Sequence, residues 1–137
     1  MPNPPVLVSA CLLGLNTRYD GANRKDEELL AKLAGRWIIP VCPEQLGGMP
    51  TPRPASCLNG ATGEQVLDGR CRIENAAGRD VTQEFVRGAN EVLLIVRTFG
   101  VEEAYLKTKS PSCGLGGFHG VCAALLLRNG VRVEAVD

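Results

Sequence analysis

Short apolar segments recur along the chain, each bounded by polar residues, glycine or proline. Residues 6–10 form a nearly continuous apolar run, which is typical of a strand buried on both faces of a sheet. Residues 37–41, 103–107 and 131–136 are of similar length and are also predicted to be strands. Because Pro40 has no amide proton, the strand at 37–41 is expected to be irregular or to lie at a sheet edge.

Three segments carry apolar residues at helical spacing and end near a glycine. The first follows Asp26, a residue type suited to capping a helix. The second follows Asp80, which forms a capping-box pattern with Gln83 and precedes apolar positions up to Phe99. The third segment, residues 121–128, is apolar nearly all round and is expected to be deeply buried.

A hairpin is predicted in the middle of the chain, where Asp68-Gly69 separates apolar positions within residues 65–74. The resulting order, β-α-β-hairpin-α-β-α-β, predicts an α/β fold with a mostly parallel sheet, right-handed crossovers and helices on both faces. This is a Rossmann-like three-layer arrangement with a small β-hairpin excursion. The length of 137 residues suits a single α/β domain that spans residues 1–137.

Composition and charge narrow the classes of function. Fifteen basic residues balance fifteen acidic ones, so no global field favours nucleic acid or a membrane surface, and a small neutral ligand fits better. No stretch approaches the roughly 18 apolar residues of a membrane span. Residues 1–5 lack the features of a signal peptide, so we expect a cytoplasmic protein whose six cysteines stay reduced.

Three of the cysteines occupy matching positions. Cys11 and Cys42 each close a predicted strand, and Cys113 lies in the turn after the strand at 103–107. In an open parallel sheet these positions meet at the carboxyl edge, where such sheets bind ligands. A single cysteine at a strand end is more often a core residue. Here three cysteines occur in this position, and each is followed by a polar loop with proline or glycine. Two interpretations therefore stay open: the three thiols share one site, or they are separate core residues.

A shared site would have a particular chemistry. No Cys-x-x-Cys motif occurs, so any metal site must be assembled from distant segments. Three converging thiolates without a nearby histidine favour a soft metal or an iron–sulfur cluster. A cubane held by three cysteines leaves one iron that can bind a substrate atom as a Lewis acid.

Polar side chains of the neighbouring loops complete the candidate site. Glu44 follows Cys42 by two residues and could move protons beside a cluster, or be an ordinary loop carboxylate. Ser110 and Ser112 could contact a ligand or hydrogen-bond their own turn. His119, the only histidine, is expected to be incidental. Three further loop residues could orient a polar ligand or pair with one another: Arg18, Asp20 and Arg53.

Several multi-residue blocks occur in a fixed order over nearly the whole chain. They are Val8-Ser-Ala-Cys-Leu-Leu-Gly14, Arg18-Tyr-Asp-Gly21, Val41-Cys-Pro-Glu44, Gly47-Gly48 with Pro52-Arg-Pro54, Gly78-Arg-Asp-Val-Thr82, Gly88-Ala89, and Leu106-Lys107 with Ser110-Pro-Ser-Cys-Gly114. Together these blocks resemble a bacterial domain-of-unknown-function family that includes the iron–sulfur-dependent 2-thiouracil desulfidases.

The resemblance implies an oxygen-sensitive 4Fe-4S cluster held by Cys11, Cys42 and Cys113, the same three thiols that close the predicted strands. It implies that the fourth iron takes the sulfur of a thiolated pyrimidine base or nucleoside. That sulfur leaves as sulfide, and the base gains oxygen. Glu44 and Ser110 match the proton-handling residues proposed for the family, so the chain resembles a desulfidase enzyme.

Two departures from the family pattern bear on the pocket. A glutamate often stands where this chain has Cys57, and the loop at 115–120 is shorter than in most members. Two alternatives to an enzyme stay open: a non-enzymatic iron–sulfur or metal-binding module that stores, senses or transfers sulfur, and a small-molecule binding domain with structural thiols. The pattern fixes neither the thiolated substrate nor the oligomeric state.

Overall fold

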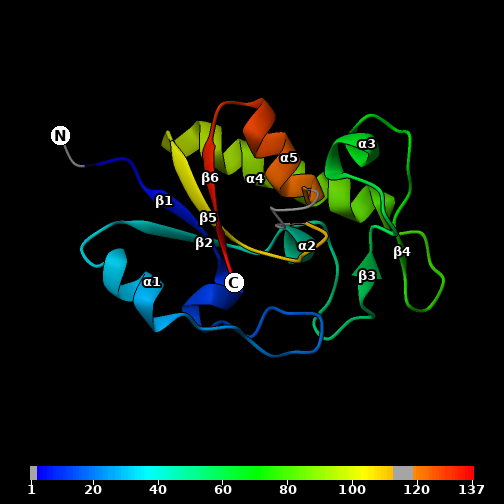
Figure 1. Ribbon diagram of the computed structural model, residues 1–137, viewed down its shortest axis with the longest axis horizontal. Coiled ribbons are helices and arrows are strands. Elements are labelled where there is room, and N and C mark those ends of the chain that lie inside the picture. Colours follow the sequence, from blue (N-terminus) through cyan, green and yellow to red (C-terminus); the bar gives the residue numbers. More distant parts are fainter. Residues whose placement is uncertain (1–2, 113–118) are drawn as a thin grey trace.

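The computed structural model describes residues 3–112 and 119–137. Within these ranges a sheet with strand order β2-β1-β5-β6 crosses the middle of the molecule (Figure 1). All of its strand pairs are parallel. The predicted α/β fold with a mostly parallel sheet is therefore confirmed. The strands are β1 (Val6–Ser9), β2 (Ile38–Val41), β5 (Glu103–Lys107) and β6 (Arg132–Val136).

Pro40 of β2 lies in an edge strand, as its missing amide proton predicts. β2 pairs only with β1, so it forms one edge of the sheet. Pro40 lies opposite Val8 in that pairing. An edge strand tolerates a residue without an amide proton, because its outer side needs no ladder hydrogen bond.

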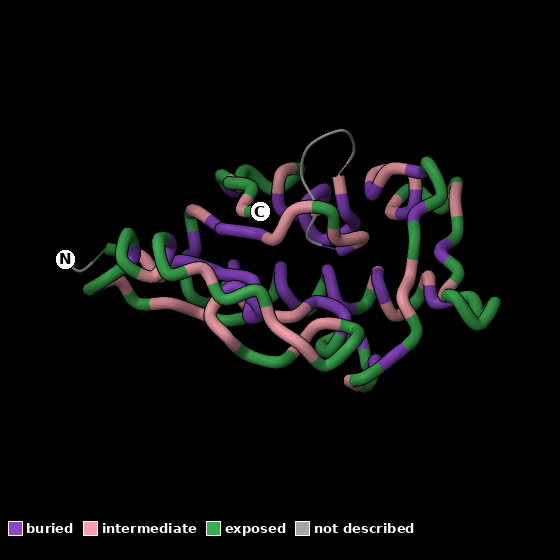
Figure 2. Tube along the Cα trace, turned by 60° about the horizontal axis from the view of Figure 1, so that its bottom comes forward, coloured by how far each residue is buried: buried purple, intermediate pink, exposed green. Residues whose placement is uncertain are grey.

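Helices cover both faces of the sheet, as predicted. Successive side chains of a strand point to opposite faces. Leu7 accordingly packs in a core with two helices, while Val6 and Val8 pack in a second core with another helix. The buried residues gather between these layers (Figure 2). The helices that pack on Leu7 in the first core include α4 (Thr82–Phe99) and α5 (Val121–Arg128), and the helix of the second core is α1 (Glu27–Lys32).

The helix ends agree with the predicted signals except at α4. Asp26 caps α1, accepting a hydrogen bond from the Leu29 amide at 2.9 Å. The expected capping box of Asp80 and Gln83 does not form, because the Asp80 carboxylate instead accepts from the amide and the hydroxyl of Thr82, at 2.9 and 2.6 Å. Asp80 therefore bonds two residues ahead, one residue short of the capping-box reach.

The predicted hairpin within residues 65–74 is wrong in its placement. Its first half is the helix α3 (Gly63–Leu67), which starts with a complete capping box between Thr62 and Gln65. A small antiparallel sheet does exist, formed by β3 (Ser56–Cys57) and β4 (Glu74–Asn75). Gly69 has φ +77°, a conformation that suits both the end of a helix and a hairpin turn.

α4 is an amphipathic helix and its apolar side builds the larger core. Five of its apolar side chains are buried there: Phe85, Ala89, Val92, Leu93 and Val96. Leu94 and Phe99 are exposed on its other side. Among residues 3–112 and 119–137 there is no helix with the length and apolar character needed to span a bilayer.

Candidate functional site

A cavity of about 150 Å³ opens at the carboxyl ends of β1, β2 and β5. Parallel strands end together at this edge, which is where open α/β sheets bind ligands. The walls come from η1 (Ala10–Leu13), from α2 (Pro43–Leu46), and from three loops. Those loops contribute residues 17–19, Arg53, Ala55 and residues 108–112, and the strands β3 and β5 add Ser56 and Lys107.

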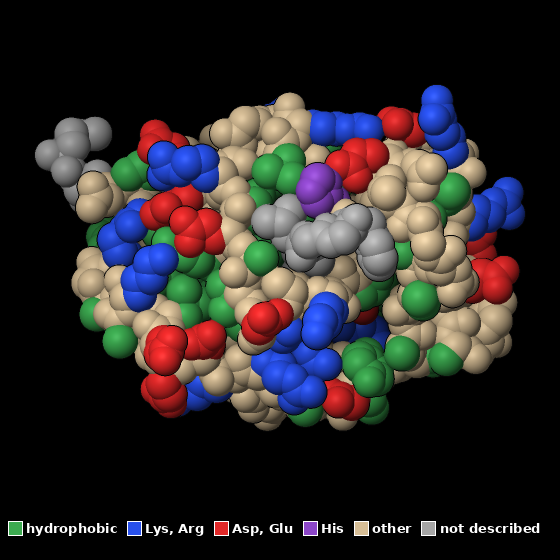
Figure 3. Space-filling model, viewed as in Figure 1, with side chains coloured by type: hydrophobic (Ala, Val, Ile, Leu, Met, Phe, Trp, Pro, Cys, Tyr) green, Lys and Arg blue, Asp and Glu red, His purple; other side chains and the backbone are tan. Residues whose placement is uncertain are grey.

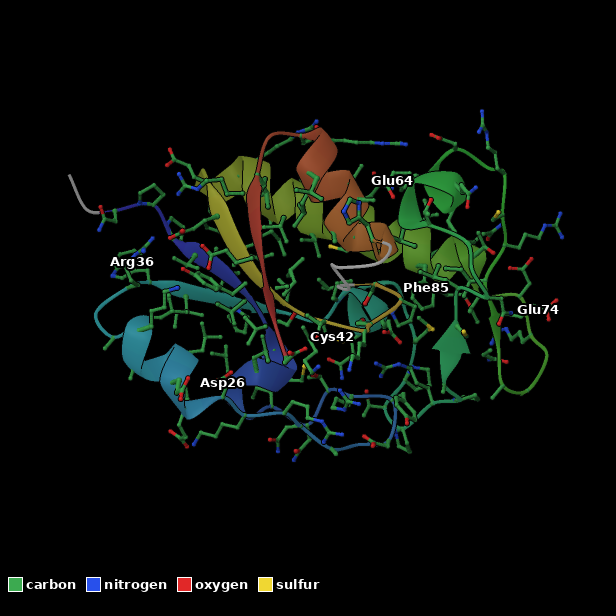
Figure 4. The ribbon with its side chains drawn as sticks, viewed as in Figure 1. Asp26, Arg36, Cys42, Glu64, Glu74 and Phe85 are labelled. Carbon is green, nitrogen blue, oxygen red and sulfur yellow. The ribbon has the colours of Figure 1, made fainter. Side chains whose placement is uncertain are left out.

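Two predicted thiols share this cavity. Cys11 lies in η1, a short 3-10 helix that follows β1 directly and ends at Gly14 with φ +97°. Cys42 follows β2 and precedes α2, where it lies near the centre of the molecule (Figure 4). Its Sγ lies 3.7 Å from the carbonyl oxygen of Thr17. The third predicted thiol, Cys113, lies outside the described residues, as does most of the loop at 115–120.

Basic side chains surround the two thiols. Arg18, Arg53 and Lys107 line the cavity, and Nη2 of Arg53 lies 3.9 Å from Sγ of Cys42. Burial raises the pKa of the Cys11 thiol, and the charge of Arg18 opposes that rise. Burial, together with Arg18, lowers the pKa of Lys107. Basic side chains also gather on the face of the molecule over the segment after η1 (Figure 3).

Glu44 occupies the first turn of α2 and is part of a buried ion pair. Its Oε1 accepts a hydrogen bond from Nε of Arg53 at 3.0 Å, and the two side chains are 11% and 4% exposed. Arg53 also donates to the carbonyl oxygen of Thr17 at 3.0 Å and to Oγ1 of Thr51 at 2.8 Å. A buried charge needs such partners, so Glu44 and Arg53 hold each other in the cavity wall.

The polar loop predicted after Cys42 begins with a helix instead. Pro43 is the first residue of α2, a position that suits proline because its missing amide proton has no partner there. α2 lies against α4, since a Cβ atom added at Gly47 would overlap the backbone of Glu84. This close contact fixes the segment that carries Cys42 and Glu44.

Two serines connect the loop after β5 to Glu44. Oγ of Ser112 donates to Oε2 of Glu44 at 3.3 Å, and the hydroxyls of Ser110 and Ser112 are 3.1 Å apart. The Ser112 carbonyl accepts from the amides of Cys122 and Ala123, which ties the loop to α5.

The remaining predicted residues separate into two groups. Arg18 lines the cavity, whereas Asp20 does not, because its carboxylate accepts from the Ala22 amide at 2.9 Å within its own turn. His119 bonds the Glu64 carboxylate and does not line the cavity. Cys57 is exposed and also lies outside the cavity lining.

Sequence reasoning missed several residues that line the cavity, among them Lys107 and Ser56. Lys107 closes β5, so a charged residue at the end of a buried strand was an available signal. Ser56 lies in β3 and carried no signal, because its position depends on the pairing of β3 with β4 across 17 residues of sequence, from Cys57 to Glu74.

The donor set of the cavity suits an iron–sulfur cluster. Thiolates are the ligands that such clusters take, and adjacent positive charges balance the negative charge of the bound thiolates. Cys11 and Cys42 supply two of them, with Arg18 and Arg53 alongside. Within the described part of the chain, no three Cys, His, Asp or Glu residues form a metal-binding group. Cys113, the remaining predicted ligand, lies outside that part.

Comparison with known proteins gives three results. A family model described as 2-thiouracil desulfurase matches residues 6–136. The uncharacterized protein YbbK of Bacillus subtilis (strain 168) is 37% identical over 140 residues, which cover 93% of each chain. The structure resembles that of the [4Fe-4S]-dependent thiouracil desulfidase TudS with a TM-score of 0.81 and 35% identity, covering 97% of this chain and 91% of TudS. The chain therefore belongs to the 2-thiouracil desulfurase family.

Proposed function

We propose that this protein is a 4Fe-4S-dependent desulfidase that converts the C=S group of a thiolated pyrimidine into C=O and releases sulfide. The observation that carries the proposal is the placement of Cys11, Cys42 and the Glu44–Arg53 ion pair around one cavity. Membership of the 2-thiouracil desulfurase family supports it. The thiols of a cluster enzyme suit the cytoplasm, which we propose as its location.

The proposed cluster ligands are Cys11, Cys42 and Cys113. When bound, the cluster supplies an iron with an open coordination position that binds sulfur and polarises the C=S bond. The other residues of the cavity bind and orient the substrate.

The reaction is a hydrolysis without a change of oxidation state. A water oxygen bonds to the ring carbon, the C–S bond breaks, and both water protons leave with sulfur as hydrogen sulfide. We assign to Glu44 the removal of the first proton from water, because its carboxylate is buried and fixed by Arg53. The hydroxyls of Ser110 and Ser112 form a hydrogen-bonded chain to Glu44, along which a proton can pass to the leaving group.

The proposal is tested by anaerobic reconstitution with iron and sulfide, followed by a screen of thiolated pyrimidine bases and nucleosides. The expected result is stoichiometric formation of sulfide and of the oxygenated base. A protein that holds the cluster and releases no sulfide from any of these compounds would contradict the enzyme and favour a module that stores, senses or transfers sulfur. A protein that binds no iron would contradict both.

A further inference from the structure

Two hydrogen-bonding atoms of the cavity residues are left without a partner. Within the described residues, three buried side-chain nitrogen or oxygen atoms have none: Nε of Arg18, Nε of Arg36 and Oγ of Ser56. Arg18 and Ser56 both line the cavity, whereas Arg36 does not. Buried polar groups are nearly always paired in folded proteins. The two exceptions in this cavity therefore indicate hydrogen-bonding groups that pair with a bound ligand.

Ser56 is held firmly in place. It lies in β3 opposite Asn75 of β4, and the carbonyl oxygen of the preceding Ala55 accepts from the Ala76 amide at 2.8 Å. Since neighbouring side chains of a strand point to opposite faces, Ser56 belongs to the cavity wall while Cys57 is exposed. The small antiparallel sheet thus has the effect of fixing one hydroxyl at the cavity.

Arg18 is fixed by its backbone rather than by its side chain. Its amide donates to the Ala22 carbonyl at 3.2 Å and its own carbonyl accepts from the Gly21 amide at 2.8 Å, which closes a tight turn. The guanidinium lies over the ring of Tyr19, with 5.9 Å from Cζ to the ring centroid. Arg18 lines the same cavity as Cys11, Cys42 and Ser56.

The hydrogen-bonding capacity of the pair matches one edge of a pyrimidine. Nε of arginine is only a donor, and a serine hydroxyl is both donor and acceptor. Besides its C=S group, a thiouracil ring carries one carbonyl oxygen, with a ring N–H between the two groups. We propose that Arg18 and Ser56 bind this oxygen-bearing edge and so fix the orientation of the C=S group in the cavity. This assignment rests on the proposed function and makes Ser56 a specificity-determining residue.

The test uses two ligands that do not react. Uracil keeps the oxygen-bearing edge, whereas pyrimidin-2-one lacks that carbonyl oxygen. A site built for a hydrogen bond rejects the analogue that lacks the partner, so the wild-type holoprotein should bind uracil more tightly in anaerobic titration calorimetry. Ser56→Ala should weaken uracil binding about tenfold and change pyrimidin-2-one binding by less than about twofold.

Arg18→Lys provides a second variant that keeps the positive charge beside Cys11 but removes the Nε donor. It should lower the affinity for uracil relative to that for pyrimidin-2-one, and this result does not depend on whether the Ser56 variant folds well. Cys57→Ala is the matched control, since it changes the next residue of β3 outside the cavity and should leave both affinities unaltered. Iron content and melting temperature are measured for each variant.

An equal loss of affinity for both ligands, no loss for either, or no uracil binding by the wild type would overturn the assignment. With 2-thiouracil as substrate, Ser56→Ala should raise KM about tenfold with kcat nearly unchanged, because the contact is present before and during the reaction. Failure of the proposed function looks different: sulfide release is then absent in the wild type, while the uracil titration still reports on the cavity edge.

Discussion

At the scale of single residues, Arg53 organises the cavity wall. One guanidinium bonds the Glu44 carboxylate, the Thr17 carbonyl and the Thr51 hydroxyl, and it lies near the Cys42 sulfur. Such a planar fork of donors holds several acceptors in fixed directions, whereas the flexible ammonium group of a lysine does not fix them in one plane. Arg53 thereby couples the position of the proposed base to that of a proposed cluster ligand.

Glu44→Gln separates proton transfer from structure. The amide oxygen can still accept from Arg53, but the side chain can no longer take a proton from water. We expect normal iron content and a turnover lowered roughly 100-fold or more, as for loss of a general base. Sulfide release is measured for this variant and, as a control, for Glu91→Gln, which changes an exposed glutamate of α4. Turnover near the wild-type rate, with the cluster verified, would move the assignment to Ser110.

The six cysteines should divide into two groups. Alanine at Cys11, Cys42 or Cys113 is expected to abolish the cluster, because each removes one of only three proposed ligands. Alanine at Cys57, Cys71 or Cys122 should leave the iron content and the visible absorption intact. Cys122 is fully buried, so its replacement should still lower the free energy of unfolding by about 1 kcal/mol.

Anaerobic iron analysis of all six variants checks this division. A Cys113→Ala protein that keeps a full cluster would refute the three-ligand assignment. Loss of iron from the Cys57 variant would equally refute it, since Cys57 is exposed and does not line the cavity.

At the scale of elements, a pair of glycines sets the position of α2. Gly47 of the α2 C-terminus meets the backbone of α4, and Gly88 of α4 meets the carbonyl of Pro43. No side chain fits between the two backbones. α2 carries Glu44 and follows Cys42, so the depth of this contact also sets the geometry of the cavity.

Gly88→Ala should therefore disturb both stability and site. The added methyl group would overlap the Pro43 carbonyl oxygen, which is backbone and cannot turn aside. We expect a loss of about 1–3 kcal/mol in unfolding free energy, as for overpacking of a core, and lower desulfidation. Asn90→Ala, at an exposed position of the same helix, is the control and should change stability little. Unchanged melting and activity in Gly88→Ala would show that α2 is free to shift.

Sequence patterns predicted the elements where one signal dominated and failed where two competed. The predicted bounds of residues 103–107 and 121–128 match the structure, because the first segment has the length of a strand and the second ends just before Gly130. Asp68-Gly69 was misread, since a left-handed glycine ends a helix as readily as it makes a hairpin. The Thr62–Gln65 capping box preceding it was the signal that decides for a helix.

The residues of the site likewise divide into those whose position could be predicted from the sequence and those whose position could not. Residues directly after strands, such as Cys11 and Cys42, could be placed at one edge from topology alone. Asp20 could not be excluded from sequence, because only the structure shows that its carboxylate is used within its own turn. Ser56 could not be included, because it reaches the cavity through a pairing of distant segments.

At the scale of the whole molecule, the two ends of the sheet serve different purposes. β5 begins at Glu103, which is paired with Arg36 at 2.9 Å and with Arg132 at 3.5 Å. It ends at Lys107, which lines the cavity. The amino end of the sheet is thus held by ion pairs, and at the carboxyl end thiols, cations and a buried carboxylate line the cavity.

Surface carboxylates elsewhere link the stability of the molecule to pH. Hydrogen bonds from Arg128 hold the pKa of Asp68 below its ordinary value of 3.8, and bonds from Thr82 do the same for Asp80. A bond from Thr108 lowers the pKa of Asp137. A carboxyl whose pKa is lower in the folded state stabilises the fold above its unfolded pKa, and this contribution is lost as pH falls through the folded value. Acid should therefore destabilise the protein below about pH 4.

Asp80→Asn isolates one of these contributions. The amide oxygen can still accept from Thr82, but the side chain no longer titrates, and an uncharged acceptor makes a weaker bond. The wild type should therefore melt at a higher temperature than the variant at pH 7, and the difference should shrink as pH falls through the range below 3.8, where the wild-type carboxyl takes up its proton.

Thermal unfolding of both proteins at pH 7, 5, 4 and 3 measures that difference. Taking the difference removes effects of acid that both proteins share, including any loss of a cluster. A difference that stays constant from pH 7 to pH 3 would mean that the Asp80 carboxylate contributes no charge-dependent stability to the start of α4.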